Sequence, residues 1–469
     1  MLLAAPGAVR ALGEEDEGWF SLFDGKTLAG WRASEYAHAF KVVDGQVVAQ
    51  GRPGRLVYTG RGPDEEFGNF ELSLEAMTRP GAECALWFHT TREAHGEQPV
   101  GLAVQVANSP AARGGFLEQR KTGSLYGVRN VYKQLVKDGE WLRLGIVARG
   151  RRVQVRINEM LVVDYVEAIS PGKGLIALGS RGVGGAAHFK NIHARRLAED
   201  APRTHDEQPA RDDVDREILR LGAENYPLVD YHVHLKGGLT IEQALANSRK
   251  TGIFYGVAIN CGLGFPVHSD ASVREYLASM KGQPCYVAMQ AEGREWRTLA
   301  SRESIAQFDY VFTDAMTFSD DTGKRMRIWL DDEVGTIADH EAFMEMLVKR
   351  IVGVLGEPID IYANATFLPR QMQPEYDTLW TPERMQTVIA AAVRNDVAIE
   401  INNRYKIPSA KFIKAAKAAG AKFSFGTNNG DAELGRLEYP IQMVRECGLG
   451  WSDIFVPKPE GMKAIQTKK

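Results

Sequence analysis

The sequence contains little cysteine and no long apolar run. Its four cysteines lie far apart and form no C-x-x-C pair: they are Cys84, Cys261, Cys285 and Cys447. This pattern indicates neither a zinc knuckle nor a dense disulfide framework, so we expect buried free thiols. Because no apolar run approaches the ~20 residues that cross a bilayer, no transmembrane segment is expected.

An excess of either sign of charge is also missing. Lys and Arg number 57 against 60 Asp and Glu, which gives a formal net charge of -3. The chain therefore has no overall basic field, and nucleic acid is not an expected partner. Its 469 residues exceed the size at which a single core usually stops growing, so more than one domain is predicted.

The first residues have the composition of a processed leader. Residues 1–17 contain a short apolar stretch and small residues before an acidic start, although a basic n-region is missing. We interpret them as an N-terminal tail or signal remnant. A periplasmic or secreted protein is then expected, or a cytoplasmic one if the segment is not a signal remnant.

The first half has the pattern of an antiparallel β-sandwich. Short segments of alternating apolar residues, separated by glycine-rich turns, fill residues 18–198, as in FKVVDGQVVAQ and NFELSLEAM. Hairpin turns are predicted near Gly150 and Asn158. Residues 199–224 are charged, contain two prolines and lack an apolar face until their end, so we interpret them as a linker.

After the linker the pattern changes to alternating strands and helices. Seven such units follow one another in residues 225–457, beginning with PLVDYHVHL and TIEQALANSRKTG. This order predicts a parallel, TIM-like (β/α)7 barrel with each strand enclosed by helices. Residues 458–469 are assigned to a C-terminal tail.

The segment VDYHVHL is the most informative motif. Alternate side chains of a strand share a face, so His232 and His234 are expected to point the same way. Neutral imidazoles are good ligands for divalent transition metals, and barrel enzymes keep their chemistry at the carboxyl ends of the strands. A strand with two satisfied structural histidines is the alternative.

Polar residues also end the other apolar strands. In a closed barrel these ends converge on one cavity, which predicts a shared polar site. For a single residue, a helix cap or the start of a loop is the alternative. The residues concerned are His232, His234, Asn260, Glu292, Asp314, Asn364, Glu400, Asn402 and Asn428.

Two imidazoles and a carboxylate are a typical ligand set for one divalent metal. His232, His234 and Glu292 supply these groups and leave coordination positions open, which suits Mn, Zn or Fe. Asp314 is the next candidate ligand and a candidate catalytic base.

Glu400 is the second candidate base. Its neighbours Ile399 and Ile401 face the opposite side of their strand, so the carboxylate is expected in the cavity as a base or as an orienter of another group. A salt bridge to a basic residue such as Arg404 or Lys406 is the alternative.

Long segments follow the fourth and fifth strands, a typical place for lids and specificity loops. Their basic residues are candidates to meet a negative group, and Trp329 and Trp380 are candidates to stack on a sugar face; a solvated loop and packing tryptophans are the alternatives. The expected substrate-binding residues are Asn260, Asn364, Asn402, Arg404, Asn428, Lys324, Arg325, Arg327 and Trp329.

On these motifs the second half resembles the polymerase and histidinol phosphatase (PHP) superfamily, metal hydrolases on a distorted seven-stranded barrel. The resemblance covers residues 226–457 and rests on VDYHVHL, the Glu292 strand, AIEINNRYKIPSAKFIKAAKAAGAKFSFGTNN and ELGRL. The family's other metal ligands are replaced here, so the resemblance implies one metal in place of a trinuclear centre. The replacing residues are Asn260, Cys261, Asp314, Asn364, Asn428 and Gly430.

The first half resembles the 3-keto-disaccharide hydrolase domain family, which implies a concanavalin-like jelly-roll sandwich. The resemblance covers residues 18–197 and rests on GWFSLFDGKTLAGW, TGSLYG, GEWLRLGIVARGRRVQVRINEMLVVDY and HFKNIHARRL. Val104 stands where the family has a Glu, and a late histidine is absent from LIALGSRGVGG. These departures favour a glycan-binding or site-shaping module over a catalyst. Its candidate residues are Gln105, Tyr126, Trp87 and His89, with Asp24 and Lys26 assigned to the opening turn.

Together the two resemblances imply a carbohydrate-active, metal-dependent enzyme that acts on a 3-keto-glycoside or a related oxidised sugar. A metal would polarise the ketone while a base removes the neighbouring proton, and elimination followed by addition of water would give net hydrolysis. A PHP-type phosphoesterase and a non-catalytic glycan-binding protein are the alternatives. A sugar or glycoside is the expected partner, and a homo-oligomer is compatible with the sequence.

Overall fold

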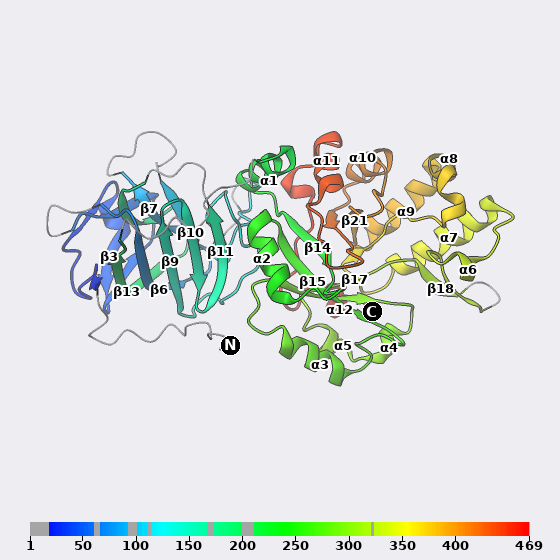
Figure 1. Ribbon diagram of the computed structural model, residues 1–469, viewed down its shortest axis with the longest axis horizontal. Helices are drawn as coiled ribbons and strands as arrows, with labels where there is room; N and C mark the ends of the chain where they lie inside the picture. Colours follow the sequence, from blue (N-terminus) through cyan, green and yellow to red (C-terminus); the bar gives the residue numbers. More distant parts are fainter. Residues whose placement is uncertain are drawn as a thin grey trace. The chain divides into compact units, whose positions relative to one another are not determined.

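The chain divides into two compact units, Met1–Asn225 and Tyr226–Lys469 (Figure 1). The computed structural model describes residues 18–60, 66–91, 101–110, 112, 114–166, 172–182, 184–198, 211–319 and 323–468. The expected leader, residues 1–17, lies outside these ranges. Within them, no helix is both long and apolar enough to cross a membrane. All four cysteines are buried and free, as expected.

The first unit is a sandwich of two antiparallel sheets. One sheet has the order β11-β10-β9-β6-β13-β4-β3, with β1 paired to β13, and the other has the order β2-β5-β12-β7-β8. The strands are β1 (Trp19–Ser21), β2 (Trp31–Ala33), β3 (Phe40–Val43), β4 (Gln46–Ala49), β5 (Gly54–Tyr58), β6 (Phe70–Thr78), β7 (Cys84–Thr90), β8 (Leu102–Val106), β9 (Leu142–Arg149), β10 (Arg152–Ile157), β11 (Met160–Val166), β12 (Leu175–Ser180) and β13 (Ala187–Arg196), and a short 3-10 helix, η1, covers Ala37–Ala39.

The alternation of apolar residues builds the core between the two sheets. In β6 the side chains of Phe70, Leu72 and Leu74 are buried in this core, whereas the residues between them are partly exposed. The two predicted hairpin turns are confirmed. Gly150 separates β9 from β10 and Asn158 separates β10 from β11, and both have a positive φ, which glycine and asparagine adopt most readily.

The segment expected to be a linker contains a helix. α1 (Asp213–Ala223) begins after Asp212, whose side chain accepts a hydrogen bond from the Asp215 N–H, and it buries Ile218 and Leu221. The cap and the spacing of these two apolar residues explain why a charged segment is helical. α1 belongs to the first unit, which ends at Asn225. The exact domain limits remain predictions.

The second unit contains the predicted closed barrel of seven parallel strands, in the order β14-β15-β16-β17-β20-β21-β22. They are β14 (Val229–Val233), β15 (Phe254–Cys261), β16 (Tyr286–Ala291), β17 (Tyr310–Thr313), β20 (Ile361–Tyr362), β21 (Ala398–Asn402) and β22 (Phe423–Gly426). Most of these strands are buried along their whole length, because the barrel interior covers one face and helices cover the other.

Helices and loops connect successive barrel strands. The α-helices are α2 (Ile241–Thr251), α3 (Asp270–Ser279), α4 (Trp296–Leu299), α5 (Arg302–Ile305), α6 (Asp331–Val334), α7 (His340–Leu355), α8 (Tyr376–Leu379), α9 (Pro382–Arg394), α10 (Ala410–Ala418), α11 (Glu438–Glu446) and α12 (Ala464–Thr467). A hairpin of β18 (Thr317–Ser319) and β19 (Arg325–Arg327) follows β17, and the 3-10 helices η2 (Arg370–Glu375) and η3 (Trp451–Asp453) complete the unit.

Candidate functional site

The polar strand ends of the barrel form a buried cluster. His232, on β14, donates a hydrogen bond from Nδ1 to Glu400 Oε1 on β21 over 2.6 Å, and both side chains are almost fully buried. Asp230 positions this strand, because its Oδ1 accepts hydrogen bonds from the N–H groups of His232 and Thr427. The motif found in the sequence thus places its first imidazole in contact with a carboxylate from β21, which is separated from β14 by β22 alone.

Both oxygens of the Glu400 carboxylate accept hydrogen bonds from neighbouring residues. Its Oε2 accepts the Asn364 N–H at 2.6 Å and the Asn402 side-chain amide at 3.0 Å, while Oε1 binds His232. Burial raises the pKa of a carboxyl, but His232 and these hydrogen bonds outweigh it and lower the pKa of Glu400 below its ordinary value. Of the two roles predicted for Glu400, this geometry favours the orienter over the base.

His234 presents a free nitrogen to the interior of the site. Its Nδ1 lies 3.2 Å from the Ala258 carbonyl oxygen, which can only accept, so the proton is on Nδ1 and the Nε2 lone pair is available. Nε2 is buried and has no hydrogen-bond partner among the residues that the structure describes. Burial, reinforced by His232, lowers the pKa of His234 well below its ordinary value, so this imidazole is neutral. Asn429 holds the backbone of His234 by two hydrogen bonds.

Gln290 is a site residue that the sequence reasoning missed. Its Oε1 lies 3.3 Å from His232 Nε2, and its side chain also lies near the His234 ring. With Nδ1 of His232 donating to Glu400, Nε2 of His232 and Oε1 of Gln290 are two acceptors that face each other, an arrangement that a cation or proton between them would stabilise. Strand alternation could have identified Gln290, because it shares a face with Glu292.

Asn364 links the remaining strand ends. Its Nδ2 donates to Asp314 Oδ2 at 3.1 Å, and its Oδ1 accepts from Asn402 and Asn428, each at 2.9 Å. Asp314 is buried, and burial raises its pKa above the ordinary value. The structure therefore brings together Asp314, Asn364, Asn402 and Asn428, as the convergence of strand ends predicts.

Glu292 lies beside this cluster and is held by a different partner. Its Oε1 accepts a hydrogen bond from the Asn260 amide at 2.7 Å. Burial, and next the neighbouring Asp314 carboxylate, raise the pKa of Glu292. Two carboxylates with raised pKa values in one cavity favour the binding of a proton or of a metal cation.

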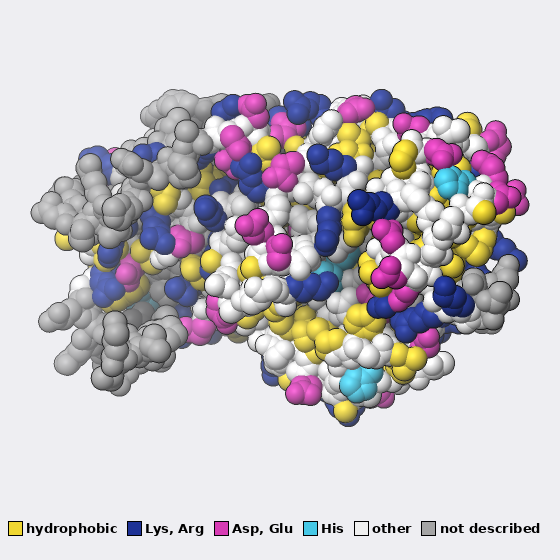
Figure 2. Space-filling view, turned by 45° about the vertical axis from the view of Figure 1, so that its right-hand side comes forward, with side chains coloured by type: hydrophobic (Ala, Val, Ile, Leu, Met, Phe, Trp, Pro, Cys, Tyr) yellow, Lys and Arg dark blue, Asp and Glu magenta, His cyan; other side chains and the backbone are white. Residues whose placement is uncertain are grey.

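The two imidazoles of the site are oriented in the way that metal ligands are. Each Nδ1 is held by an oxygen acceptor, which is the arrangement that directs Nε2 toward a metal, and Gln290 Oε1 is a third donor beside them. Across the described ranges, no three His, Cys, Asp or Glu side chains are gathered closely enough to hold a metal. In Figure 2, histidine atoms are visible in a hollow between basic and acidic side chains.

The basic residues of the loop after β17 bind another part of that loop. Arg327 forms a salt bridge with Glu333, and Lys324 Nζ donates to the Glu333 carbonyl oxygen at 2.9 Å. Arg325 is exposed on β19, and Trp329 is 38% exposed. These residues are not part of the hydrogen-bonded cluster, and their role in substrate binding remains a prediction.

Two further candidates occupy contrasting environments. Trp380 is buried and donates from Nε1 to the Thr366 carbonyl oxygen, as a packing tryptophan does. Arg404 is exposed, and its Nη1 lies 3.3 Å from the Asn428 carbonyl oxygen. Arg404 is thus placed next to the hydrogen-bonded polar residues at the strand ends, which we call the strand-end cluster: His232, Asp314, Asn364, Glu400, Asn402 and Asn428.

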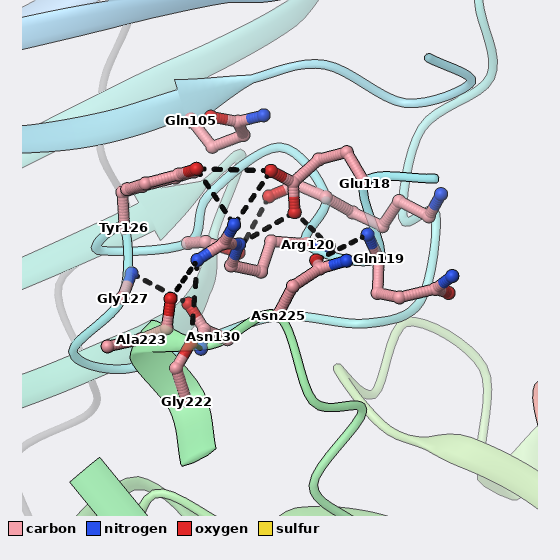
Figure 3. A network of polar contacts seen from close by, with 12 residues as sticks. Gln105, Glu118, Gln119, Arg120, Tyr126, Gly127, Asn130, Gly222, Ala223 and Asn225 are labelled. Atoms are coloured by element: carbon pink, nitrogen blue, oxygen red, sulfur yellow. Dashed lines mark hydrogen bonds and ion pairs between the residues drawn. The ribbon is translucent and has the colours of Figure 1, made fainter. Parts of the chain in front are cut away.

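A second polar network lies in the sandwich (Figure 3). Arg120 forms a salt bridge with Glu118 at 2.6 Å, and the Tyr126 hydroxyl contacts both side chains. The Tyr126 ring lies between two guanidinium groups, with the Cζ atoms of Arg120 and Arg181 at 3.9 and 3.7 Å from its centroid. Arg181 also donates to Gln105 Oε1 at 3.2 Å.

This network fastens the end of α1 to the sandwich. Arg120 Nη1 lies 3.4 Å from the Gly222 carbonyl oxygen and 3.3 Å from that of Ala223, and it satisfies the last carbonyls of the helix. Asn225 Oδ1 accepts the Gln119 N–H at 2.9 Å. The sequence reasoning assigned no role to Glu118 or Arg120, and the network gives both a structural role.

The other sandwich candidates lie on or near the sheet β2-β5-β12-β7-β8. Val104 is buried in the core, and Gln105, next to it on β8, points to the opposite face. Trp87 is buried in a small cluster with Val57 and Ala177. His89 is buried, and its Nε2 donates to the Gly68 carbonyl oxygen.

Asp24 and Lys26 form the predicted opening turn. Asp24 Oδ1 accepts the backbone N–H groups of Lys26 and Thr27, at 2.8 and 2.7 Å. An aspartate that accepts hydrogen bonds from the backbone two and three residues ahead stabilises a turn by itself. Glycan binding by Gln105, Tyr126, Trp87 and His89 remains a prediction.

A family of known proteins matches the sandwich. Residues 18–195 match the family described as 3-keto-alpha-glucoside-1,2-lyase-like domain. A 3-keto-disaccharide hydrolase of Bacteroides thetaiotaomicron is 27% identical over 170 residues, which represent 32% of this chain and 59% of that protein. The chain thus spans less than two thirds of the length of this curated relative. The first unit carries a domain of this family, as its motifs predicted.

Solved structures of other proteins are similar to a part of this chain. Two proteins of Parabacteroides distasonis, proposed to be glycosyl hydrolases, are 19% and 22% identical, with TM-scores of 0.35 and 0.32. They cover 40% and 38% of this chain and 99% of their own chains. The carbohydrate-binding module CBM66 of Bacillus subtilis is 14% identical, has a TM-score of 0.24, and covers 35% of this chain and 95% of its own.

Proposed function

We propose that this protein is a carbohydrate-active hydrolase that acts on a 3-keto-glycoside, or a related oxidised sugar, in the cavity of the barrel. The sandwich family supports the sugar substrate. The barrel supports the location of the chemistry, because its strand ends carry two imidazoles, three carboxylates and three amides of the predicted set that are buried, while the half-buried Asn260 amide binds Glu292. The sandwich has the supporting role of a sugar-binding module.

A divalent metal would be held by Nε2 of His232 and of His234, with Gln290 Oε1 beside them as an oxygen donor. When bound, the metal supplies Lewis-acid polarisation of the substrate ketone. Glu400 keeps His232 in the tautomer that exposes Nε2, and the Ala258 carbonyl does the same for His234.

Asp314 is the proposed base. It removes the proton from the carbon between the ketone and the anomeric carbon, and Asn364 holds its carboxylate by a hydrogen bond of 3.1 Å. The electron pair of the broken C–H bond forms the new C=C bond as the bond to the aglycone oxygen breaks. The aglycone leaves with the electron pair of the broken C–O bond and takes up a proton. Water then adds across the C=C bond, so that the net reaction is hydrolysis.

The observation that carries this proposal is the buried, unpartnered Nε2 of His234 beside a second imidazole whose Nδ1 is fixed by a carboxylate. A buried nitrogen without a partner costs stability unless a ligand uses it. The arrangement therefore supports a ligand-binding site more strongly than a structural histidine pair.

The test is metal content together with turnover of 4-nitrophenyl 3-keto-β-glucoside. We expect the wild type to bind about one equivalent of Mn, Zn or Fe and to release 4-nitrophenol. The His232→Ala/His234→Ala variant should lose both properties, and His268→Ala, at an exposed position, should keep both. Protein that binds no metal after reconstitution and leaves the keto-glucoside intact would contradict the proposal.

A further inference from the structure

We infer that a cavity beside the strand-end cluster binds a planar aromatic group, the aglycone of the glycoside, and the identity of this group as an aglycone rests on the proposed function. The cavity has a volume of about 480 Å³ and is formed by the loops after β20 and β21 together with the first residues of α10 and α11. This volume lies in the range of small-molecule sites, about 300–1,000 Å³.

Aromatic rings make up much of the wall. Phe367, Tyr376, Tyr405 and Tyr439 line the cavity, and the rings of Phe367 and Tyr405 pack edge to face with centroids 4.9 Å apart. The Tyr439 hydroxyl donates to the Pro408 carbonyl oxygen, and the Tyr376 hydroxyl binds Thr366. Because the protein already binds these two hydroxyls, a ligand in the cavity would contact the aromatic faces and edges of the rings. Such a surface favours a flat, apolar ligand.

Two polar groups in the wall remain available to a ligand. Among the described residues, neither the Tyr405 hydroxyl nor the Lys406 ammonium has a hydrogen-bond or salt-bridge partner. Lys406 is the one charged side chain among the residues that line this cavity, and it is positive. The wall therefore suits an aromatic ring that carries an oxygen with partial or full negative charge, such as a phenol.

Two residues of the cavity wall are hydrogen-bonded to residues of the strand-end cluster. The Phe367 N–H donates to the Asn364 carbonyl oxygen at 3.1 Å, and the Tyr405 N–H donates to Asn402 Oδ1 at 2.9 Å. Burial raises the pKa of Tyr405; the Arg404 guanidinium opposes this effect, and the carboxylates of Asp314 and Glu400 reinforce it. The wall of the aromatic cavity thus adjoins the cluster at which we place the sugar, and we assign the aglycone to the cavity on this basis.

The first experiment measures binding of 2-naphthol to the full chain by isothermal titration calorimetry. Ala410→Phe fills the cavity from α10, and Ala415→Phe introduces the same side chain at an exposed position of the same helix. We expect binding to the wild type and to Ala415→Phe, and affinity at least about tenfold weaker for Ala410→Phe. Gln373→Trp, which closes the cavity from its exposed rim, is the second variant should Ala410→Phe not fold.

Lys406→Met tests the polar part of the inference. We expect it to weaken binding of 2-naphthoate more than binding of naphthalene, because only the former carries a negative charge. Absence of 2-naphthol binding to the wild type, or equal affinity in Ala410→Phe and Ala415→Phe, would overturn the cavity assignment.

Turnover separates this inference from the proposed function. Ala410→Phe should raise the KM of an aryl 3-keto-glucoside and leave the KM of the methyl 3-keto-glucoside within about twofold. Naphthol binding without turnover of either glycoside would refute the proposed function, and with it the aglycone assignment, while the aromatic site would stand. Turnover with the same KM for the aryl substrate in both variants would refute the site and leave the proposed function intact.

Discussion

The Nδ1 atom of His232 and the Oε1 atom of Glu400 are 2.6 Å apart, although the two residues are separated by 168 positions in the sequence. Their side chains are 1% and 2% exposed, so water does not weaken the interaction. Because Oε1 accepts a hydrogen bond from Nδ1, the other ring nitrogen of His232 carries the lone pair and faces Gln290 Oε1. This relationship fixes the tautomer and the orientation of the His232 ring.

Replacing Glu400 tests this relationship. We expect Glu400→Gln to lower the affinity for Mn or Zn by about 10- to 100-fold, because the amide no longer fixes the tautomer and orientation of His232 with a charged acceptor. Metal affinity is measured by competition with a chromogenic chelator. Glu242→Gln, on the exposed side of α2, is the matched control and should behave as the wild type. Equal affinities in the two variants would contradict the orienting role.

Gln290 provides a second test of the site. Gln290→Leu removes the oxygen next to His232 Nε2, and we expect metal affinity at least about tenfold weaker with little change in stability, since Leu fills a similar volume. Gln386→Leu, at an exposed position of α9, is the control. Unchanged metal affinity in Gln290→Leu would remove Gln290 from the ligand set.

The salt bridge between Arg120 and Glu118 should contribute strongly to the stability of the sandwich. Arg120→Met leaves the Glu118 carboxylate buried without its cation, and we expect a loss of about 3–5 kcal/mol in the free energy of unfolding. Hydrogen exchange followed by mass spectrometry on peptides of β6 and β9 measures this loss.

Arg152 and Asp164 form the matched exposed pair, with the arginine side chain 44% exposed. Arg152→Met should cost less than about 1 kcal/mol, because water screens the pair. Similar losses in Arg120→Met and Arg152→Met would show that the network around Tyr126 has no special structural role.

His89 should make the stability of the sandwich depend on pH. Burial lowers the pKa of His89 below its ordinary value, although the Gly68 carbonyl opposes this effect. Because of this lower pKa, the unfolded chain binds a proton on His89 more readily than the folded chain does. The neutral His89 side chain therefore makes its full contribution to the free energy of unfolding above the unfolded pKa of about 6.5. That contribution is lost as the pH falls toward the folded pKa.

The measurement is hydrogen exchange of β6 and β7 between pH 7.5 and 5.5, corrected for the intrinsic pH dependence of exchange. His89→Asn, which tolerates the positive φ at this position, should flatten the fall in stability below about pH 6.5. His268→Asn, at an exposed position, should retain the wild-type slope. A wild-type slope in His89→Asn would assign the pH dependence to other groups.

The sequence was sufficient to predict the sandwich and the seven barrel strands, because alternating residues and strand-helix repeats are local patterns. It also predicted that the polar strand ends converge, because the carboxyl ends of all strands in a closed parallel barrel lie at the same end of the barrel. The pairing of His232 with Glu400 could not be predicted, because it depends on the closure of the barrel, which places β14 and β21 on either side of β22.

Two features escaped the sequence reasoning for identifiable reasons. Gln290 was overlooked because a single amide in an apolar strand has no distinctive spacing, although its alternation with Glu292 was available. The cavity around Tyr405 depends on loops whose conformation has no periodic signal. Structure was needed to place both features beside the predicted site.

The most direct test of the central claim, that the reaction takes place in the barrel, is release of 4-nitrophenol from 4-nitrophenyl 3-keto-β-glucoside by two variants. Asp314→Asn should lower kcat by about 10²- to 10⁴-fold, because it removes the proposed base. Gln105→Leu, in the sandwich, should keep kcat near the wild-type value. Full activity of Asp314→Asn together with loss of activity in Gln105→Leu would place the reaction in the sandwich and contradict the account.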